Sequence, residues 1–160
     1  MIKRRIHHSF VSYIDKSRNY YAAQGYEEPY GWAHQDRVPF RALNKPLAEC
    51  RVGVATTADR GPRVDGRHVR LYAAPIEKAQ SLHTEMSWDR EATHTEDPET
   101  YVPLAAISRH VADRRIGSAS TRFYGVATEY SQRRTLEEDA PQIERWMRED
   151  GLDVCVMVAI

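Results

Sequence analysis

The sequence of 160 residues has only two cysteines, no long apolar run and no excess of either charge. Two cysteines are too few for a disulfide framework, so we expect a reducing, cytoplasmic location. No apolar run approaches the roughly 20 residues of a membrane helix. The basic start, MIKRRIHHSF, is not followed by the apolar segment of a secretory signal. Lys plus Arg and Asp plus Glu both number 23, which argues against binding to nucleic acid or to an acidic membrane surface.

Apolar segments typical of strands alternate with segments of helical spacing. Strands are predicted at residues 51–55, 68–73 and 153–160, with a short one at 79–86. Helices are predicted at residues 9–24, 103–115 and 135–149, the last begun by a capping box of Thr135 and Glu138 and ended at Gly151. This alternation predicts an α/β fold: a mainly parallel sheet with flanking helices, Rossmann-like and three-layered.

The distribution of proline suggests how the chain is organised. Residues 1–50 are predicted to form an amino-terminal helix and a linker that contains Pro29, Pro39 and Pro46. Residues 51–160 are predicted to form the α/β domain, and the two parts together make a single globular unit. Two stretches are predicted to be loops: residues 84–100, which are polar and acidic, and residues 116–130, which are rich in small and polar residues.

The last ten residues, GLDVCVMVAI, combine a turn with a strand that is apolar at nearly every position. Such a strand is expected to be covered on both faces, as in a parallel sheet. Ligands of α/β proteins bind beyond the carboxyl ends of the strands. The sequence therefore stops where binding would be expected to begin. Either a small domain ends on a central strand, or the fold is incomplete.

Polar residues in two kinds of loop are candidates for chemistry. Thr56 and Thr57 follow the first predicted strand, where hydroxyls and turn amides can hold a carboxylate. Arg122 and Tyr124, in the second small-residue stretch, can also bind a carboxylate. A further polar loop carries His83, Glu85, Asp89, His94 and Asp97. These side chains can act as acid and base, orient an amine or ligate a divalent metal.

Each of these groups also has a purely structural interpretation. The histidines and carboxylates fit a solvated acidic loop, the threonines an ordinary turn, and Arg122 a surface arginine. No zinc site is predicted, because the sequence has no cysteine pair and this polar loop has no close histidine pair. The residues alone leave two functions open: a non-catalytic α/β module that binds a small carboxylate or a subunit, and a metal-assisted hydrolase.

Several segments in series resemble one known family. They are VSYIDKSRNYYAAQGY, VPFRALNKPLAECRVGVATTA, SLHTEMSWDREATHTEDPETYVPL, RRIGSASTRFYGVA and LEEDAPQIERWMREDGLDVCVMVAI. Together they resemble the amino-terminal part of the selenoprotein B family of glycine, sarcosine, betaine and D-proline reductases. The resemblance covers nearly the whole sequence. It favours His83 and Asp89 as catalytic residues. Thr56, Thr57, Arg122 and Tyr124 remain the candidates for binding the substrate.

The resemblance also places Ile160 directly before the family's selenocysteine. Selenocysteine is encoded by UGA, so we expect the chain to be truncated there and to be inactive by itself. In the family a selenolate attacks the carbon that bears the amino group. A pyruvoyl group on a partner subunit activates the amine, and reductive C–N cleavage follows. The implied partners are a small amine or carboxylate substrate and that subunit, with no cofactor or metal in this chain.

Overall fold

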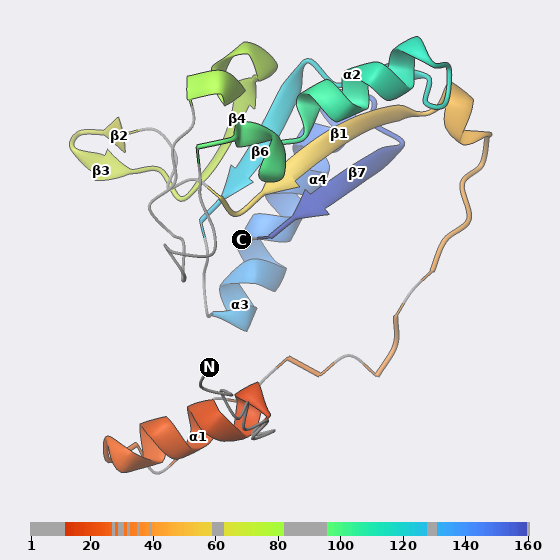
Figure 1. The fold of residues 1–160 in the computed structure, drawn as a ribbon. Helices are drawn as coiled ribbons and strands as arrows, with labels where there is room; N and C mark the ends of the chain where they lie inside the picture. The colour runs from red at the N-terminus through yellow and green to blue at the C-terminus, as the bar shows by residue number, and fades with distance from the viewer. Residues whose placement is uncertain are drawn as a thin grey trace, which may run out of the picture. The chain divides into compact units, whose positions relative to one another are not determined.

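A computed structural model describes residues 12–26, 28, 31, 33–34, 36–38, 40–58, 63–81, 96–127 and 131–159 (Figure 1). The chain divides into two compact units, residues 1–39 and 40–160. In the first unit, helix α1 spans Tyr13–Ala23. Ser12 caps it by accepting a hydrogen bond from the Asp15 backbone N–H, and Gly25 follows it with a φ of +87°. The helix and its glycine stop agree with the prediction over the described residues.

The second unit is built on a five-stranded, mostly parallel sheet. Its strands are β1 (Arg51–Thr56), β4 (Leu71–Pro75), β5 (Ser118–Ala119), β6 (Arg122–Val126) and β7 (Val154–Val158). β1 pairs with β5 and β6 along one side and with β7 along the other, always in parallel. β4 pairs with β6 in antiparallel orientation. The predicted α/β fold with a mainly parallel sheet is therefore confirmed.

Short elements and helices connect these strands. The helices are α2 (Leu104–Ala112), α3 (Gln132–Arg134), a π-helical segment (Thr135–Asp139) and α4 (Ala140–Glu149). Three short 3₁₀ helices span Leu47–Glu49, Ile76–Ser81 and Pro98–Thr100. A separate hairpin joins β2 (Arg63–Val64) to β3 (Arg67–His68). No helix in the described part of the chain is long and apolar enough to cross a membrane.

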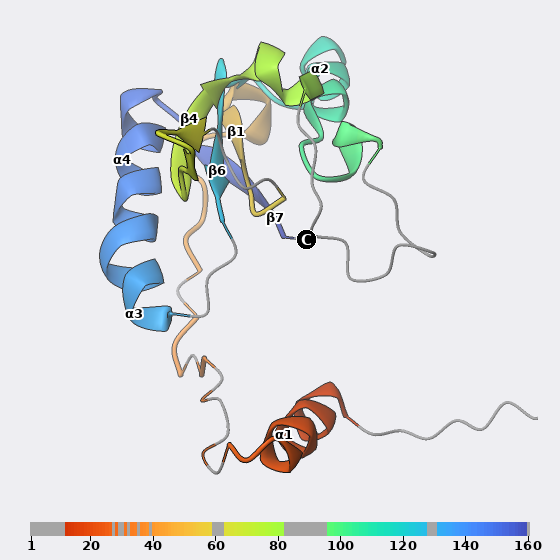
Figure 2. The same ribbon diagram turned by 90° about the vertical axis from the view of Figure 1, so that its left-hand side faces the viewer.

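Helices α2 and α4 cover opposite faces of the sheet (Figure 2). On one face, Val54 and Phe123 belong to the same apolar cluster as Ile107 of α2. On the other face, Tyr124 clusters with Ile143 of α4. Neighbouring residues of a strand point to opposite faces, so β6 contributes Phe123 to one cluster and Tyr124 to the other. β1 lies between both layers, and all but its first residue are buried.

Two predictions about loops and strands were wrong. Residues 116–130 were expected to form a loop, yet β5 and β6 lie there. The glycines in this stretch serve close packing: a Cβ on Gly125 would lie 2.2 Å from the Tyr72 ring, and one on Gly117 would lie 2.9 Å from the Cys50 carbonyl oxygen. Conversely, the strand expected at residues 79–86 is contradicted where the structure describes it, because Ile76–Ser81 is a 3₁₀ helix.

The start of the last helix was also predicted wrongly. The helical stretch begins at Gln132, where Ser131 accepts a hydrogen bond from the Arg134 backbone N–H. Thr135 therefore lies inside the helical stretch and does not cap it. The predicted end is confirmed, because α4 ends at Glu149 and Gly151 adopts a φ of +62°.

The last strand lies at the edge of the sheet, and two of its apolar side chains are exposed. The prediction that both its faces are covered was therefore wrong. Among the described residues, β7 pairs with β1 alone. Val156 is 39% exposed and Met157 is 71% exposed. An exposed apolar edge strand promotes association with other chains. We expect Met157→Lys to shift the chain towards monomer, measured by size-exclusion chromatography with light scattering. An unchanged mass distribution would show that β7 does not mediate association.

Candidate functional site

The carboxyl ends of β1, β6 and β7 lie at one edge of the sheet, as their arrowheads show (Figure 1). Thr56 is the last residue of β1, and Thr57 follows it. The Thr56 hydroxyl accepts a hydrogen bond from the Ala58 backbone N–H at 3.1 Å. The Thr57 backbone N–H donates to the Val158 carbonyl at 3.1 Å. The two threonines thus join the end of β1 to the end of β7.

The helices that connect the strands indicate which part of this edge is suited to bind a ligand. The connection from β1 to β5 and β6 includes α2, which packs on one face of the sheet. The connection from β6 to β7 includes α4, which packs on the other face. In open α/β sheets, ligands bind at the carboxyl edge where neighbouring strands send their connections to opposite faces. The ends of β1 and β6 meet this condition.

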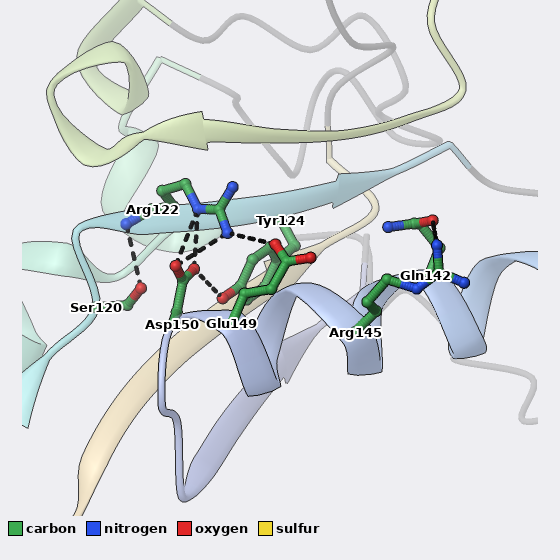
Figure 3. A network of polar contacts seen from close by, with 7 residues as sticks. All are labelled: Ser120, Arg122, Tyr124, Gln142, Arg145, Glu149 and Asp150. Atoms are coloured by element: carbon green, nitrogen blue, oxygen red, sulfur yellow. Dashed lines mark hydrogen bonds and ion pairs between the residues drawn. The ribbon is translucent and has the colours of Figure 1, made fainter.

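Arg122 and Tyr124 lie in a polar network with Asp150, the residue that follows α4 (Figure 3). The Arg122 guanidinium donates from Nε to Oδ2 and from Nη2 to Oδ1 of Asp150, both at 2.9 Å. The Tyr124 hydroxyl donates to Asp150 Oδ2 at 2.6 Å. The Arg122 backbone N–H donates to Ser120 Oγ at 3.1 Å, and Glu149 lies 3.4 Å from Nη2. We call Arg122, Tyr124 and Asp150 the Asp150 network.

The Asp150 network shifts the pKa of each member. Burial by itself would raise the pKa of Asp150, but the hydrogen bonds from Arg122 and Tyr124 outweigh it and lower the pKa. The hydrogen bond to Asp150 raises the pKa of Arg122. Burial, together with the bond to the carboxylate, raises the pKa of Tyr124 well above its usual range. At neutral pH the network is therefore an ion pair with a neutral tyrosine.

The network joins strand β6 to the end of α4. The Tyr124 ring is stacked on Trp146 of α4, with ring centroids 6.2 Å apart and planes 13° apart. Asp150 was not predicted from the sequence. One signal was present: a carboxylate at a helix carboxyl end faces the negative end of the helix dipole, so it needs a cationic partner. The position of that partner, 28 residues away in sequence, depends on the packing of α4 against the sheet.

The depressed pKa of Asp150 predicts an acid-sensitive contribution to stability. A group whose pKa is lower in the folded state stabilises the fold above its unfolded pKa, about 3.9 for aspartate, and this contribution is lost as pH falls through the folded value. We expect Asp150→Asn to lower the free energy of unfolding, with the largest difference from wild type at pH 7. This difference should shrink below about pH 4. Urea unfolding at pH 7, 5 and 3 measures this. A difference that is independent of pH would contradict it.

The structure does not bring the four predicted substrate-binding residues together. Arg122 precedes Gly125, the partner of Thr56, by three residues, which is roughly 10 Å along a strand. Thr56 and Thr57 lie at the carboxyl edge, while the Arg122 guanidinium binds Asp150. Substrate binding by Arg122 and Tyr124 stays a prediction, and a substrate carboxylate would compete there with Asp150.

The predicted catalytic residues, His83 and Asp89, lie outside the described residues, as does Ile160. Asp97, at the end of the same polar loop, accepts a hydrogen bond from the Glu99 backbone N–H at 3.0 Å. Within the described ranges, no group of three His, Cys, Asp or Glu side chains is placed to hold a metal ion. The metal-assisted hydrolase stays a prediction.

Comparisons with known proteins leave the family of this chain open. The candidate site consists of the carboxyl edge at Thr56 and Thr57, and of the Asp150 network on the α4 face. No protein-family model, curated protein or solved structure matches the chain.

Proposed function

We propose that this chain is the amino-terminal part of an oxidoreductase of the selenoprotein B reductase type. One observation supports the proposal most directly. β7 is parallel to β1 along its whole length, from Val154 opposite Val52 to Val158 opposite Thr56. The chain therefore leaves β7 at the carboxyl edge, beside Thr56 and Thr57. A redox residue soon after β7 would follow at the edge where α/β proteins bind ligands.

The proposed chemistry assigns separate tasks to the residues of this edge. A selenolate after residue 160 supplies the nucleophile for reductive C–N cleavage, with a pyruvoyl group on a partner subunit. Thr57, which is partly exposed, is proposed to bind the substrate carboxylate. Thr56, which is 1% exposed, is proposed to bind it as well, through a hydroxyl that accepts from Ala58 and can also donate a hydrogen. His83 and Asp89 are proposed as the acid and base, and the full domain as a Rossmann-like, three-layered fold.

Reading the gene beyond codon 160 is the first test. We expect an in-frame UGA, followed by a frame that encodes a cysteine. The extended chain, made with selenocysteine and combined with its pyruvoyl subunit, should convert glycine, sarcosine, betaine or D-proline with a dithiol reductant. The 160-residue chain should be inactive under the same conditions. Noncoding DNA after codon 160, or full activity with serine in place of the selenocysteine, would contradict the proposal.

A second candidate is a non-catalytic α/β module that binds a partner subunit. The exposed side chains of Val156 and Met157 on β7 favour it, because an apolar strand edge can pair with another chain. The two candidates differ in one measurable property. A partner-binding module would form a stable complex with its subunit but show no turnover even after extension beyond residue 160.

A further inference from the structure

Asp139 is a buried carboxylate with one oxygen that has no partner. It ends the π-helical segment, and its side chain is only 3% exposed. Its Oδ1 accepts a hydrogen bond from Nη1 of Arg70. Its Oδ2 is buried and has no hydrogen-bond partner among the described residues. Buried carboxylate oxygens are normally hydrogen-bonded, so this one calls for an explanation.

Asp150, at the other end of the same helix, shows how the fold satisfies a carboxylate. Oδ1 of Asp150 accepts from Arg122, and its Oδ2 accepts from both Arg122 and Tyr124. Asp139 has the same kind of guanidinium partner on one oxygen, but within the described ranges it has nothing equivalent on the other. Asp139 does not cap α4 either, because its side chain accepts no hydrogen bond from the first turn. The open oxygen is thus not explained by a role in the helix.

The Arg70–Asp139 pair lies at the carboxyl edge of the sheet. The Arg70 carbonyl accepts a hydrogen bond from the Ala127 backbone N–H at 2.8 Å, directly after the end of β6. Only β6 separates Arg70 from the end of β1, so Arg70 and Thr57 are roughly two strand spacings, about 10 Å, apart. π-helical turns inside helices occur frequently at functional sites.

The charges around Asp139 indicate what kind of group is missing. Arg70 is shared between Asp139 and Glu138, whose Oε2 lies 3.0 Å from Nη2 of Arg70. A second guanidinium, that of Arg134, lies 3.9 Å from Glu138. Among the described residues, the guanidiniums of Arg70 and Arg134 thus face the carboxylates of Glu138 and Asp139. The open oxygen of Asp139 needs a hydrogen-bond donor, and a cationic donor forms the stronger bond with a carboxylate. The Arg70 side chain is 28% exposed and that of Asp139 is 3% exposed.

We propose that Arg70 and Asp139 form a binding site for a small ligand that carries a primary or secondary ammonium group. Asp139 Oδ2 accepts a hydrogen bond from the ammonium N–H. Arg70 has N–H donors beyond the two used for Asp139 and Glu138, so it can also bind a carboxylate of the same ligand. A small amino acid has both groups. A quaternary ammonium has no N–H and is excluded. That this ligand is the reductase substrate rests on the proposed function; the binding site does not.

Binding of simple ammonium compounds to the purified chain tests the site. Isothermal titration is carried out with methylammonium, glycine and tetramethylammonium, all as chlorides. We expect methylammonium and glycine to bind and tetramethylammonium, of equal charge, not to bind. Asp139→Asn should weaken binding by at least about tenfold, because it removes a charged acceptor. Glu138→Gln removes the same charge from the adjacent, exposed residue and should change the affinity by less than about threefold.

Three results would overturn the site. They are the absence of methylammonium binding to wild type, equal affinity of wild type and Asp139→Asn, and equal binding of tetramethylammonium. Should Asp139→Asn fail to fold, a crystal structure of wild type in methylammonium decides. Its nitrogen on Asp139 Oδ2 supports the site, and a water molecule alone there overturns it. None of these measurements requires turnover, so a failure of the reductase proposal would not affect them.

Discussion

Replacing Asp150 with alanine should lower the free energy of unfolding by about 3 kcal/mol. The substitution leaves the Arg122 guanidinium and the Tyr124 hydroxyl without their shared acceptor. The Asp150 side chain is 14% exposed and that of Arg122 is 31% exposed. Removing one partner of a buried ion pair costs about 3–5 kcal/mol, and the partial exposure of Arg122 places this pair at the lower end.

Chemical denaturation followed by circular dichroism measures this loss. Tyr124→Phe, which removes one hydrogen bond, should cost about 1 kcal/mol. Glu149→Ala is the matched control, because Glu149 contacts the same guanidinium from a side chain that is 53% exposed. Its effect should stay within about 0.5 kcal/mol. Equal losses for Asp150→Ala and Glu149→Ala would show that the Asp150 network does not stabilise the contact between β6 and α4.

Phe123→Ala should lower the free energy of unfolding by about 4 kcal/mol. Phe123 is fully buried on the α2 face of β6. Its ring centroid lies 6.1 Å from that of Tyr72, with the planes 87° apart. Truncation therefore removes buried apolar surface, leaves a cavity and breaks an edge-to-face aromatic contact.

Two further substitutions control for the change in residue type. Phe123→Leu keeps most of the volume and should cost less than about 1.5 kcal/mol. Phe40→Ala makes the same change at a side chain that is 93% exposed, so we expect a change within about 0.5 kcal/mol. Thermal and urea unfolding give both values. A loss below about 1 kcal/mol for Phe123→Ala would mean that the α2 face repacks freely.

The periodicity of the sequence was sufficient for the three longest helices and for two of the strands. Helices α1, α2 and α4 and strands β1 and β7 lie close to the predicted ranges, because their apolar spacing or apolar runs are local features. β6 was missed because Gly125 suggests a loop. Gly125 is required because the Tyr72 ring packs against it. Tyr72 is distant in sequence, so a local pattern cannot indicate this contact.

The burial of the last strand was predicted wrongly for a similar reason. An apolar run shows that a strand can be buried. Whether the strand is in fact buried depends on its position in the sheet, which the run does not reveal. β1 has partners on both sides, whereas β7 pairs with β1 alone within the described ranges.

The candidate site was predictable only in part. Thr56 and Thr57 lie at the carboxyl end of the first strand, Thr56 as its last residue and Thr57 directly after it, because strand ends can be read from the sequence. The partner of Arg122 could not be predicted, because Asp150 reaches it only through the packing of α4 against β6. The ion pair of Asp139 could not be predicted for the same reason, because its partner, Arg70, lies 69 residues earlier in the sequence.

The pairing of β1 with β7 also has a consequence for folding during synthesis. The Arg51 backbone N–H donates to Asp153 across 102 residues, and five consecutive residue pairs follow between the two strands. Contacts between residues so distant in sequence form slowly, because a long loop must close first. On the ribosome, one side of β1 therefore waits for its neighbour until β7, about 100 residues later in the chain, has emerged. A chaperone that shields this side meanwhile would raise the yield of native protein.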